Sequence, residues 1–322
     1  MIGKIKNIAA NNVAWVILLL LVIVFSFASP NFFRVSNLVN IVTQNSHIIV
    51  TGLGVTFIMM SGGLDLSVGY QIALTGVLAG LLMQKVNVPL PLVILFVLVV
   101  SVLFSSLNMA LSMAFKLNYL MISIGTMSIF QGITYIISGG STFRDFCPGF
   151  NGIGRGTVLG VPIPIIIMLV MFIIVSLILG KTYIGRHVFA IGGNKEAARL
   201  AGINIEKTQM FIAMMAGIGI GLGTLILMSR SGVSGASIGP GTEMNVMTGV
   251  LLGGVSVRGG SGKVSCVIAG ILILALLSNG LQMAGLDVYF QYVAKGVFMI
   301  LALTVDSVQA AKKSAGKMKK AA

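Results

Sequence analysis

The residues with the clearest chemical purpose lie in a polar stretch, Lys181 to Lys207, between two long apolar segments. Its centre reads GNKEAARLAG, in which Asn194 is a good N-cap and Gly202 suits the left-handed position that ends a helix. Glu196 can pair with Arg199, which follows three residues later. A helix of about eight residues is too short to be stable alone in water. The stretch therefore predicts a short docking helix that binds either the rest of its own chain or a partner protein.

This predicted helix has two different faces. Ala197, Leu200 and Ala201 recur at the spacing of one apolar face, whereas Lys195 and Arg199 lie together on another. The pattern favours a contact that combines small apolar side chains with a few charges.

A second polar interruption, SGGLDLSVG, spans Ser61 to Gly69 between two apolar segments. In one interpretation Gly62 or Gly63 ends the incoming helix, and Asp65 or Ser67 caps the outgoing one. In the other, the costly carboxylate faces the interior and marks a pathway, a coupling element or a proton site. Both interpretations stay open, and the candidate residues of this helix-break motif are Gly62, Gly63, Asp65, Ser67 and Gly69.

Catalytic chemistry has little support in the sequence. The run GGSGKV, Gly259 to Val264, contains the GK of a phosphate-binding loop, but Val257 stands where the first glycine belongs and Val264 where the hydroxyl residue belongs. Cys147 and Cys266 are the only cysteines, and no HExxH or CxxC pattern occurs. We predict no catalytic residues, no metal site and no bound cofactor.

Composition places these motifs in a membrane. The chain is 57% hydrophobic and 9% charged, with a mean hydropathy of +1.04, which excludes a water-soluble globule. We expect a single all-α membrane domain over residues 1–322. Its apolar segments are long enough for ten transmembrane helices: Asn12–Ser29, Val42–Ser61, Ser67–Met83, Pro89–Phe115, Tyr119–Ser138, Pro162–Gly180, Thr208–Ser229, Glu243–Val257, Val264–Met283 and Val288–Asp306.

The distribution of Lys and Arg predicts the orientation of this domain. Most of them lie in the two termini and in the loops on the same side as the termini, which by the positive-inside rule places both termini in the cytoplasm. The loop 181–207 and the basic tail 309–322 are then cytoplasmic too. The net charge of +14 is explained by orientation and by anionic lipid, so we expect no nucleic-acid partner.

Several segments resemble those of one family. SPNFFRVSNLVNIV, SGGLDLSVG, GRHVFAIGGNKEAARLAGI, LLGGVSVRGGSGKV and SNGLQMAGL occur in the order found in bacterial ribose-type sugar ABC importer permeases, over about Pro30 to Asp306. The resemblance implies a multi-pass protein of the bacterial cytoplasmic membrane that keeps its first span, although that span also looks like a signal peptide. EAARLAG matches the start of the broader importer signature but lacks its closing Leu-Pro.

The resemblance also implies partners and sites. A second permease copy, a cytoplasmic ABC ATPase and an extracytoplasmic sugar-binding protein are expected partners, with ATP hydrolysis in the separate ATPase. The predicted coupling residues for that ATPase are Asn194, Glu196, Ala197, Arg199 and Gly202.

Uncharged polar residues within the spans suit a neutral sugar, although such residues also join helices to one another. The predicted route contains Gln44, Asn45, Asn279 and Gln282. Lys295 either extends toward the membrane surface or pairs within the bundle. Two alternatives remain: a permease of the same family for branched-chain amino acids or a sugar-derived signal, and an ion-coupled transporter that uses Asp65, with Glu243 or Lys295.

Overall fold

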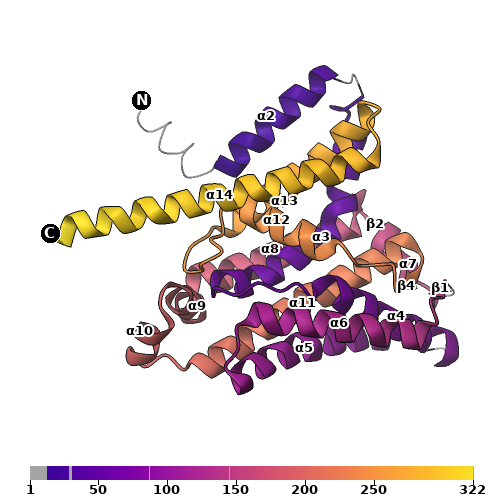
Figure 1. Cartoon of the computed structure of the whole chain (residues 1–322). Coiled ribbons are helices and arrows are strands. Elements are labelled where there is room, and N and C mark those ends of the chain that lie inside the picture. The colour runs from indigo at the N-terminus through magenta and orange to yellow at the C-terminus, as the bar shows by residue number, and fades with distance from the viewer. Residues whose placement is uncertain (1–12, 29–30, 87, 145, 322) are drawn as a thin grey trace.

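The computed structural model describes residues 13–28, 31–86, 88–144 and 146–321, and nearly all of them are helical (Figure 1). Four two-residue strands form two small antiparallel sheets, β1 with β4 and β2 with β3. The elements, in chain order, are α2 (Val13–Ala28), α3 (Val35–Met60), α4 (Val68–Val86), α5 (Leu90–Phe115), α6 (Tyr119–Ser138), β1 (Thr142–Phe143), α7 (Phe150–Arg155), β2 (Thr157–Val158), β3 (Val161–Pro162), α8 (Ile163–Lys181), α9 (Tyr183–Gly193), α10 (Lys195–Leu200), α11 (Ile205–Ser231), β4 (Ser234–Gly235), α12 (Thr242–Leu252), α13 (Val264–Met283) and α14 (Val288–Ala321).

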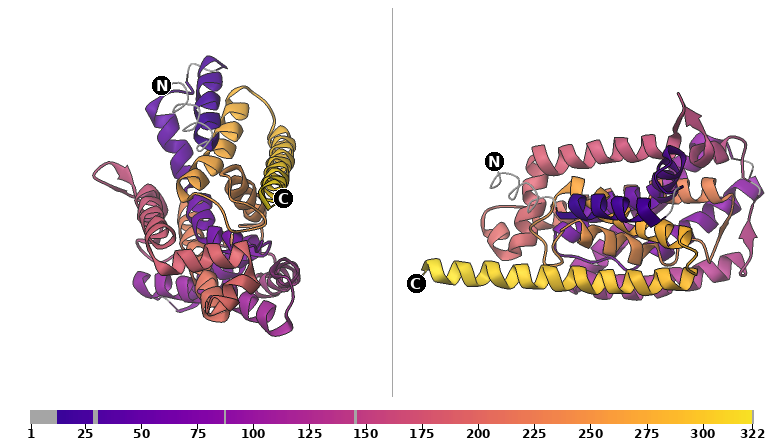
Figure 2. Two further views of the ribbon diagram at one scale, coloured as in Figure 1. Left: turned by 90° about the vertical axis from the view of Figure 1, so that its left-hand side faces the viewer. Right: turned by 90° about the horizontal axis from the view of Figure 1, so that it is seen from above.

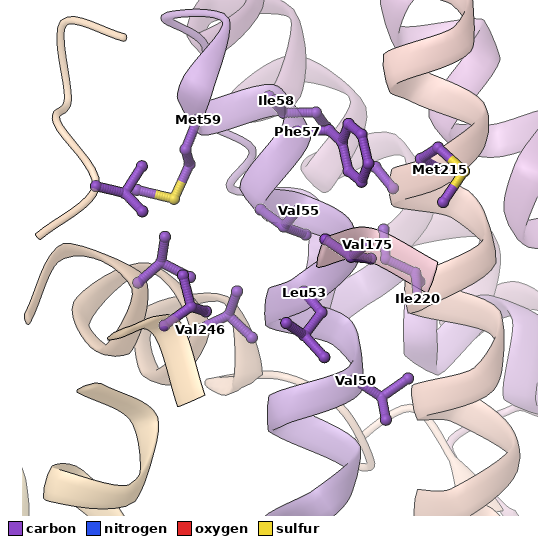
Figure 3. Close-up of a cluster of buried hydrophobic side chains, with 14 of the residues drawn as sticks. Val50, Leu53, Val55, Phe57, Ile58, Met59, Val175, Met215, Ile220 and Val246 are labelled. Carbon is purple, nitrogen blue, oxygen red and sulfur yellow. The ribbon is translucent and has the colours of Figure 1, made fainter. Parts of the chain in front are cut away.

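Helix α3 forms the centre of the bundle. Its residues 48–60 are all buried, and they pack against α11, α8 and α12. Figure 3 shows Phe57 of α3 beside Met215 of α11 and Val175 of α8 beside Ile220 of α11, while Val246 of α12 lies on the other side of α3. This apolar cluster holds together elements that lie far apart in the sequence.

Two glycines set the closest approach of the two central helices. A Cβ atom added at Gly54 of α3 would lie 2.8 Å from the Cα of Gly219 in α11, and the reverse substitution meets the same obstacle. Small residues allow helix backbones to approach closely in membranes. The glycine-rich run of α11 therefore serves packing.

The molecule has two distinct ends. Helices α9 and α10 lie at one end, and α7 and the small sheets lie at the other (Figure 1). The long helices run between these ends (Figure 2). We call the end with α9 and α10 the docking end, and the end with α7 and the small sheets the hairpin end.

The prediction of ten full-length helical spans is only partly confirmed. Within the described part of the chain, six helices are long and apolar enough to cross a membrane: α3, α5, α6, α8, α11 and α13. The apolar helices Val13–Phe27 and Tyr289–Thr304 are shorter. Each of the ten predicted segments does contain a helix, and α14 continues through the predicted tail to Ala321.

The predicted span Glu243–Val257 is wrong as a continuous helix. Helix α12 has 11 residues, or about 16 Å against the roughly 30 Å of a bilayer core. The chain before it consists of turns and bends apart from the short strand β4, which pairs with β1, and Gly239 lies against the backbone of Gly69 in α4. Both β4 and α12 pack against α4.

The polar stretch 181–207 contains more helix than predicted. In addition to α10 it forms α9, which begins where the Thr182 hydroxyl accepts a hydrogen bond from the N–H of Gly185. Val188 and Ile191 of α9 are buried. The sequence did not predict α9, because three of its 11 residues are glycines, which disfavour a helix.

Candidate functional site

The predicted docking helix is present as α10. The side chain of Asn194 accepts a hydrogen bond of 2.9 Å from the N–H of Ala197 and caps the helix, and Gly202 adopts a left-handed φ of 81° just beyond its end. Glu196 and Arg199 form the predicted ion pair, at 3.3 Å. Because both side chains are exposed, this pair adds little stability.

The apolar contacts of α10 differ from those expected. Ala198, 4% exposed, attaches α10 to the bundle by packing with Ile191 and Ile205. Leu200 of the predicted apolar face is 88% exposed, and Ala197 is exposed as well. Short helices rotate to bury whichever face their neighbours allow, and here that leaves a large apolar side chain in the open.

A groove runs beside α10 at the docking end. It has a volume of about 670 Å³ and both acidic and basic side chains along its walls. The charged residues that line it are Lys116, Lys195, Glu196, Arg199 and Glu206.

The segment that contains α9 and α10 contacts the core through backbone atoms, with no side chain between them. The N–H of Gly260 donates a hydrogen bond of 2.8 Å to the carbonyl oxygen of Met60, the last residue of α3. A Cβ atom at Gly192, near the end of α9, would collide with both of these groups. The end of α9, the end of α3 and the loop after α12 thus touch without intervening side chains. We call this contact the glycine junction.

The helix-break motif forms a turn in which Gly62 is exposed and Asp65 and Ser67 are buried. Gly62, with φ of 89°, follows the end of α3 as one interpretation predicted. Gly63 precedes the turn, and Gly69 lies in the first turn of α4, against the carboxylate of Glu243. Asp65 and Ser67 are completely buried, so the carboxylate faces the interior, as the second interpretation expected.

Asp65 lies at the centre of a hydrogen-bond network. Its Oδ1 accepts from the N–H and the hydroxyl of Ser67, and its Oδ2 accepts from Gln71 and, at 2.9 Å, from the hydroxyl of Tyr119. Asn108 of α5 also donates to the Ser67 hydroxyl, at 2.8 Å. Burial raises the pKa of the Asp65 carboxyl, and these hydrogen bonds oppose that shift. The network joins α4, α5 and α6 around the turn.

The residues predicted for the substrate route come together at the hairpin end. They border one cavity of about 370 Å³, between α3, α11, α13 and α14. All four predicted residues are present in its lining: Gln44, Asn45, Asn279 and Gln282.

The same cavity has polar lining that the sequence did not assign to it. His47 and Arg230 lie near Gln44, while Gln291 and Lys295 contribute from α14. Their residue types marked them as unusual in apolar spans, but only the rotation of each helix determines which side chains face the cavity. No aspartate or glutamate borders it in the described part of the chain.

The cavity walls are partly fixed by hydrogen bonds. Asn37 donates to the side-chain oxygen of Asn279 at 3.1 Å and so ties α3 to α13. Asn45 donates to the carbonyl of Ile41 at 2.8 Å, which leaves its own side-chain oxygen able to accept. Uncharged donors and acceptors from several helices therefore converge on one volume.

A narrow extension continues from this cavity toward the middle of the bundle. Its volume is about 30 Å³, and it shares Asn45, Ser278 and Lys295 with the larger cavity. Asn245, in the first turn of α12, borders only the extension.

Comparison with known proteins relates this geometry to transport. Residues 37–303 match a family described as "Branched-chain amino acid transport system / permease component". The chain is 34% identical over 304 residues to the ribose import permease protein RbsC of Haemophilus influenzae, covering 93% of this chain and 94% of that protein.

Other relatives show similar coverage. Identity is 34% over 297 residues with the ribose import permease protein RbsC of Bacillus subtilis, covering 91% of this chain and 92% of that protein. It is 32% over 317 residues with the galactose/methyl galactoside import permease protein MglC of Escherichia coli, covering 93% and 94% respectively. No solved structure matches the chain.

Proposed function

Because the chain belongs to the family of ribose-type ABC importer permeases, we propose that it is the membrane subunit through which an ATP-driven importer moves a simple sugar into the cell. Its place is the bacterial inner membrane, which it crosses several times. The polar cavity is the sugar route, and α10 receives the force of a separate ATPase.

The proposed orientation places the docking end in the cytoplasm. The chain then crosses the membrane ten times, and both termini are cytoplasmic. The segment before α12 and α12 itself together count as one of these crossings. The Lys and Arg distribution supports this orientation. The polar cavity, at the hairpin end, then opens toward the extracytoplasmic side, where a sugar-binding protein delivers its cargo.

The proposed ATPase contact is the exposed face of α10. Leu200 offers an apolar anchor of the kind that a partner's groove buries. Glu196 and Arg199 provide charge contacts, Ala197 allows close approach, and Asn194 and Gly202 define the ends of the helix. Within this proposal a second permease copy completes the importer, and the outward apolar surface faces lipid.

The residues that line the cavity favour a sugar over an amino acid as the transported molecule. A branched-chain amino acid has an ammonium group, which a buried site normally pairs with a carboxylate. The described lining has no carboxylate to pair with that ammonium group. Besides the cations Arg230 and Lys295, it has several amide and hydroxyl groups, which suit the hydroxyl groups of a sugar. The names of the relatives, ribose and galactose permeases, support the same choice.

The ion-coupled alternative finds little support in the acidic side chains. Asp65 accepts four hydrogen bonds within its network, and the carboxylate of Glu243 accepts the N–H of Gly241 at 3.0 Å. Neither residue borders the polar cavity.

The direct test of cargo is ATP hydrolysis by the complete importer. Permease and ATPase are reconstituted in lipid discs, and binding proteins for pentoses, hexoses and branched-chain amino acids are added separately. We expect a sugar-loaded binding protein to stimulate hydrolysis. Stimulation by an amino-acid-binding protein alone would refute the sugar assignment and leave the permease assignment intact.

A further inference from the structure

Lys295 is an unusual residue for the interior of a membrane protein. A charged side chain within a span is costly unless it faces a cavity or an opposite charge. Among the residues that the structure describes, no carboxylate forms an ion pair with Lys295. Its Nζ lies 5.8 Å from the ring centroid of Tyr292, a weak contact at most.

The location of Lys295, rather than an ion pair or the contact with Tyr292, explains why a charged residue is present here. It borders both the 370 Å³ cavity and the 30 Å³ extension, and so lies at the passage between them. An ammonium group has three hydrogen-bond donors and no acceptor. Such a group at a passage is matched to a ligand rich in oxygen acceptors.

The other polar side chains at this passage are also available to form hydrogen bonds with a ligand. Asn245 of α12 and Ser278 of α13 form no side-chain hydrogen bond with any residue in the described ranges, and Asn45 keeps a free acceptor. Together they offer donors and acceptors from opposite walls, whereas Ile48 and Ile271 make the remaining lining apolar. This mixture of a few polar groups in an apolar setting is typical of binding sites.

We propose that Lys295, Asn245 and Ser278 form a second, deeper sugar subsite, which holds the hydroxyl groups of an uncharged sugar as it leaves the outer cavity. The subsite rests on the proposed sugar route. Its volume, about 30 Å³, is less than a tenth of the 370 Å³ of the outer cavity. In this proposal a sugar enters the subsite when α12, which carries Asn245, moves away from α13 and α14.

The test compares two variants that each remove one positive charge. Lys295→Met keeps the chain length but removes the donors, and Lys85→Met does the same at the exposed end of α4, outside the cavity. Sugar uptake is measured in proteoliposomes that contain the ATPase, with saturating sugar-loaded binding protein outside.

For Lys295→Met we expect the maximal uptake rate to fall at least tenfold. The sugar concentration for half-maximal uptake should stay unchanged, because the binding protein sets it. Assembly with the ATPase should also stay at the wild-type level. Lys85→Met should transport like the wild type, and Lys295→Arg, which restores donors, should recover part of the rate.

Two results would overturn the subsite. Lys295→Met could transport at the wild-type rate, or it could fail to assemble, which would assign Lys295 to a subunit contact. If Lys295→Met is not recovered from membranes, Asn245→Leu and Ser278→Ala decide, and wild-type rates in both would reject the subsite. Absence of ATP-driven sugar uptake in the wild type would instead refute the proposed function.

Discussion

At the scale of single residues, Asp65 has the most restrictive surroundings. Every hydrogen bond that it makes is accepted by its carboxylate oxygens, from Ser67, Gln71 and Tyr119. An asparagine at this position would direct its side-chain N–H group toward one of these residues, which also donates a hydrogen bond. The buried network would then contain an unsatisfied polar group, which proteins tolerate poorly.

We therefore predict that Asp65→Asn destabilises the protein. Loss of a buried charged acceptor costs about 1–3 kcal/mol or more, whereas Tyr119→Phe, which removes one donor, should cost about 1 kcal/mol. Thermal unfolding of the purified variants in detergent measures both effects. An Asp65→Asn protein that is as stable as the wild type but cannot transport would contradict this structural role and point to direct coupling.

Residue types revealed more of the cavity than of the network. Gln44, Asn45, Asn279 and Gln282 were predicted because polar residues are rare in apolar spans, and the structure brings them together. The partners of Asp65 could not be predicted, because Tyr119 lies 54 residues away in the sequence. Such pairings depend on how helices pack, which composition does not encode.

At the scale of elements, α10 is held to the bundle on one side and open on the other. Leu200→Asp should lower the affinity for the ATPase at least tenfold, because it places a charge in the predicted apolar contact. Leu159→Asp, also at an exposed leucine but at the hairpin end, is the matched control. Pull-down of the ATPase from membranes compares the two, and equal retention by both variants would reject α10 as the docking element.

The glycine junction gives a second prediction for the elements. Alanine normally stabilises a helix relative to glycine by about 0.5–1 kcal/mol. Gly193→Ala should follow this rule, since nothing lies within 4 Å of its added Cβ, whereas at Gly192 the Cβ would collide with the backbone of Met60 and Gly260.

The two alanine variants therefore provide an internal comparison. Gly192→Ala should melt at a lower temperature than Gly193→Ala, and its Gly260 amide should exchange hydrogen faster. Equal melting temperatures and equal exchange would mean that the backbone contact contributes nothing measurable.

Hydropathy predicted elements well where they are long and apolar, as in α5 and α13. It was wrong for the end of α12, because hydropathy does not register that Gly253 and Gly254, the latter with φ of 79°, stop the helix before Val257. It also gave no sign of α9, whose helix depends on the Thr182 cap and on burial of Val188 and Ile191. Caps were predicted correctly where residue type alone decides them, as at Asn194 and Gly202.

At the scale of the whole molecule, the proposed site of force and the proposed site of transport lie at opposite ends. Helix α3 connects them, since its last residue enters the glycine junction and its other half borders the polar cavity. Helix α12 makes a parallel connection through the loop that contains Gly260. Both are packed in the apolar core, and densely packed elements transmit displacement well.

The central claim is that this chain moves a sugar by ATP hydrolysis in a partner. Uptake of labelled ribose and galactose, each with its loaded binding protein, into proteoliposomes that hold the permease and its ATPase tests it most directly. We predict accumulation of a sugar that requires ATP inside the vesicle and persists when ion gradients are collapsed. Uptake that continues without ATP and disappears with the ion gradient would contradict the claim.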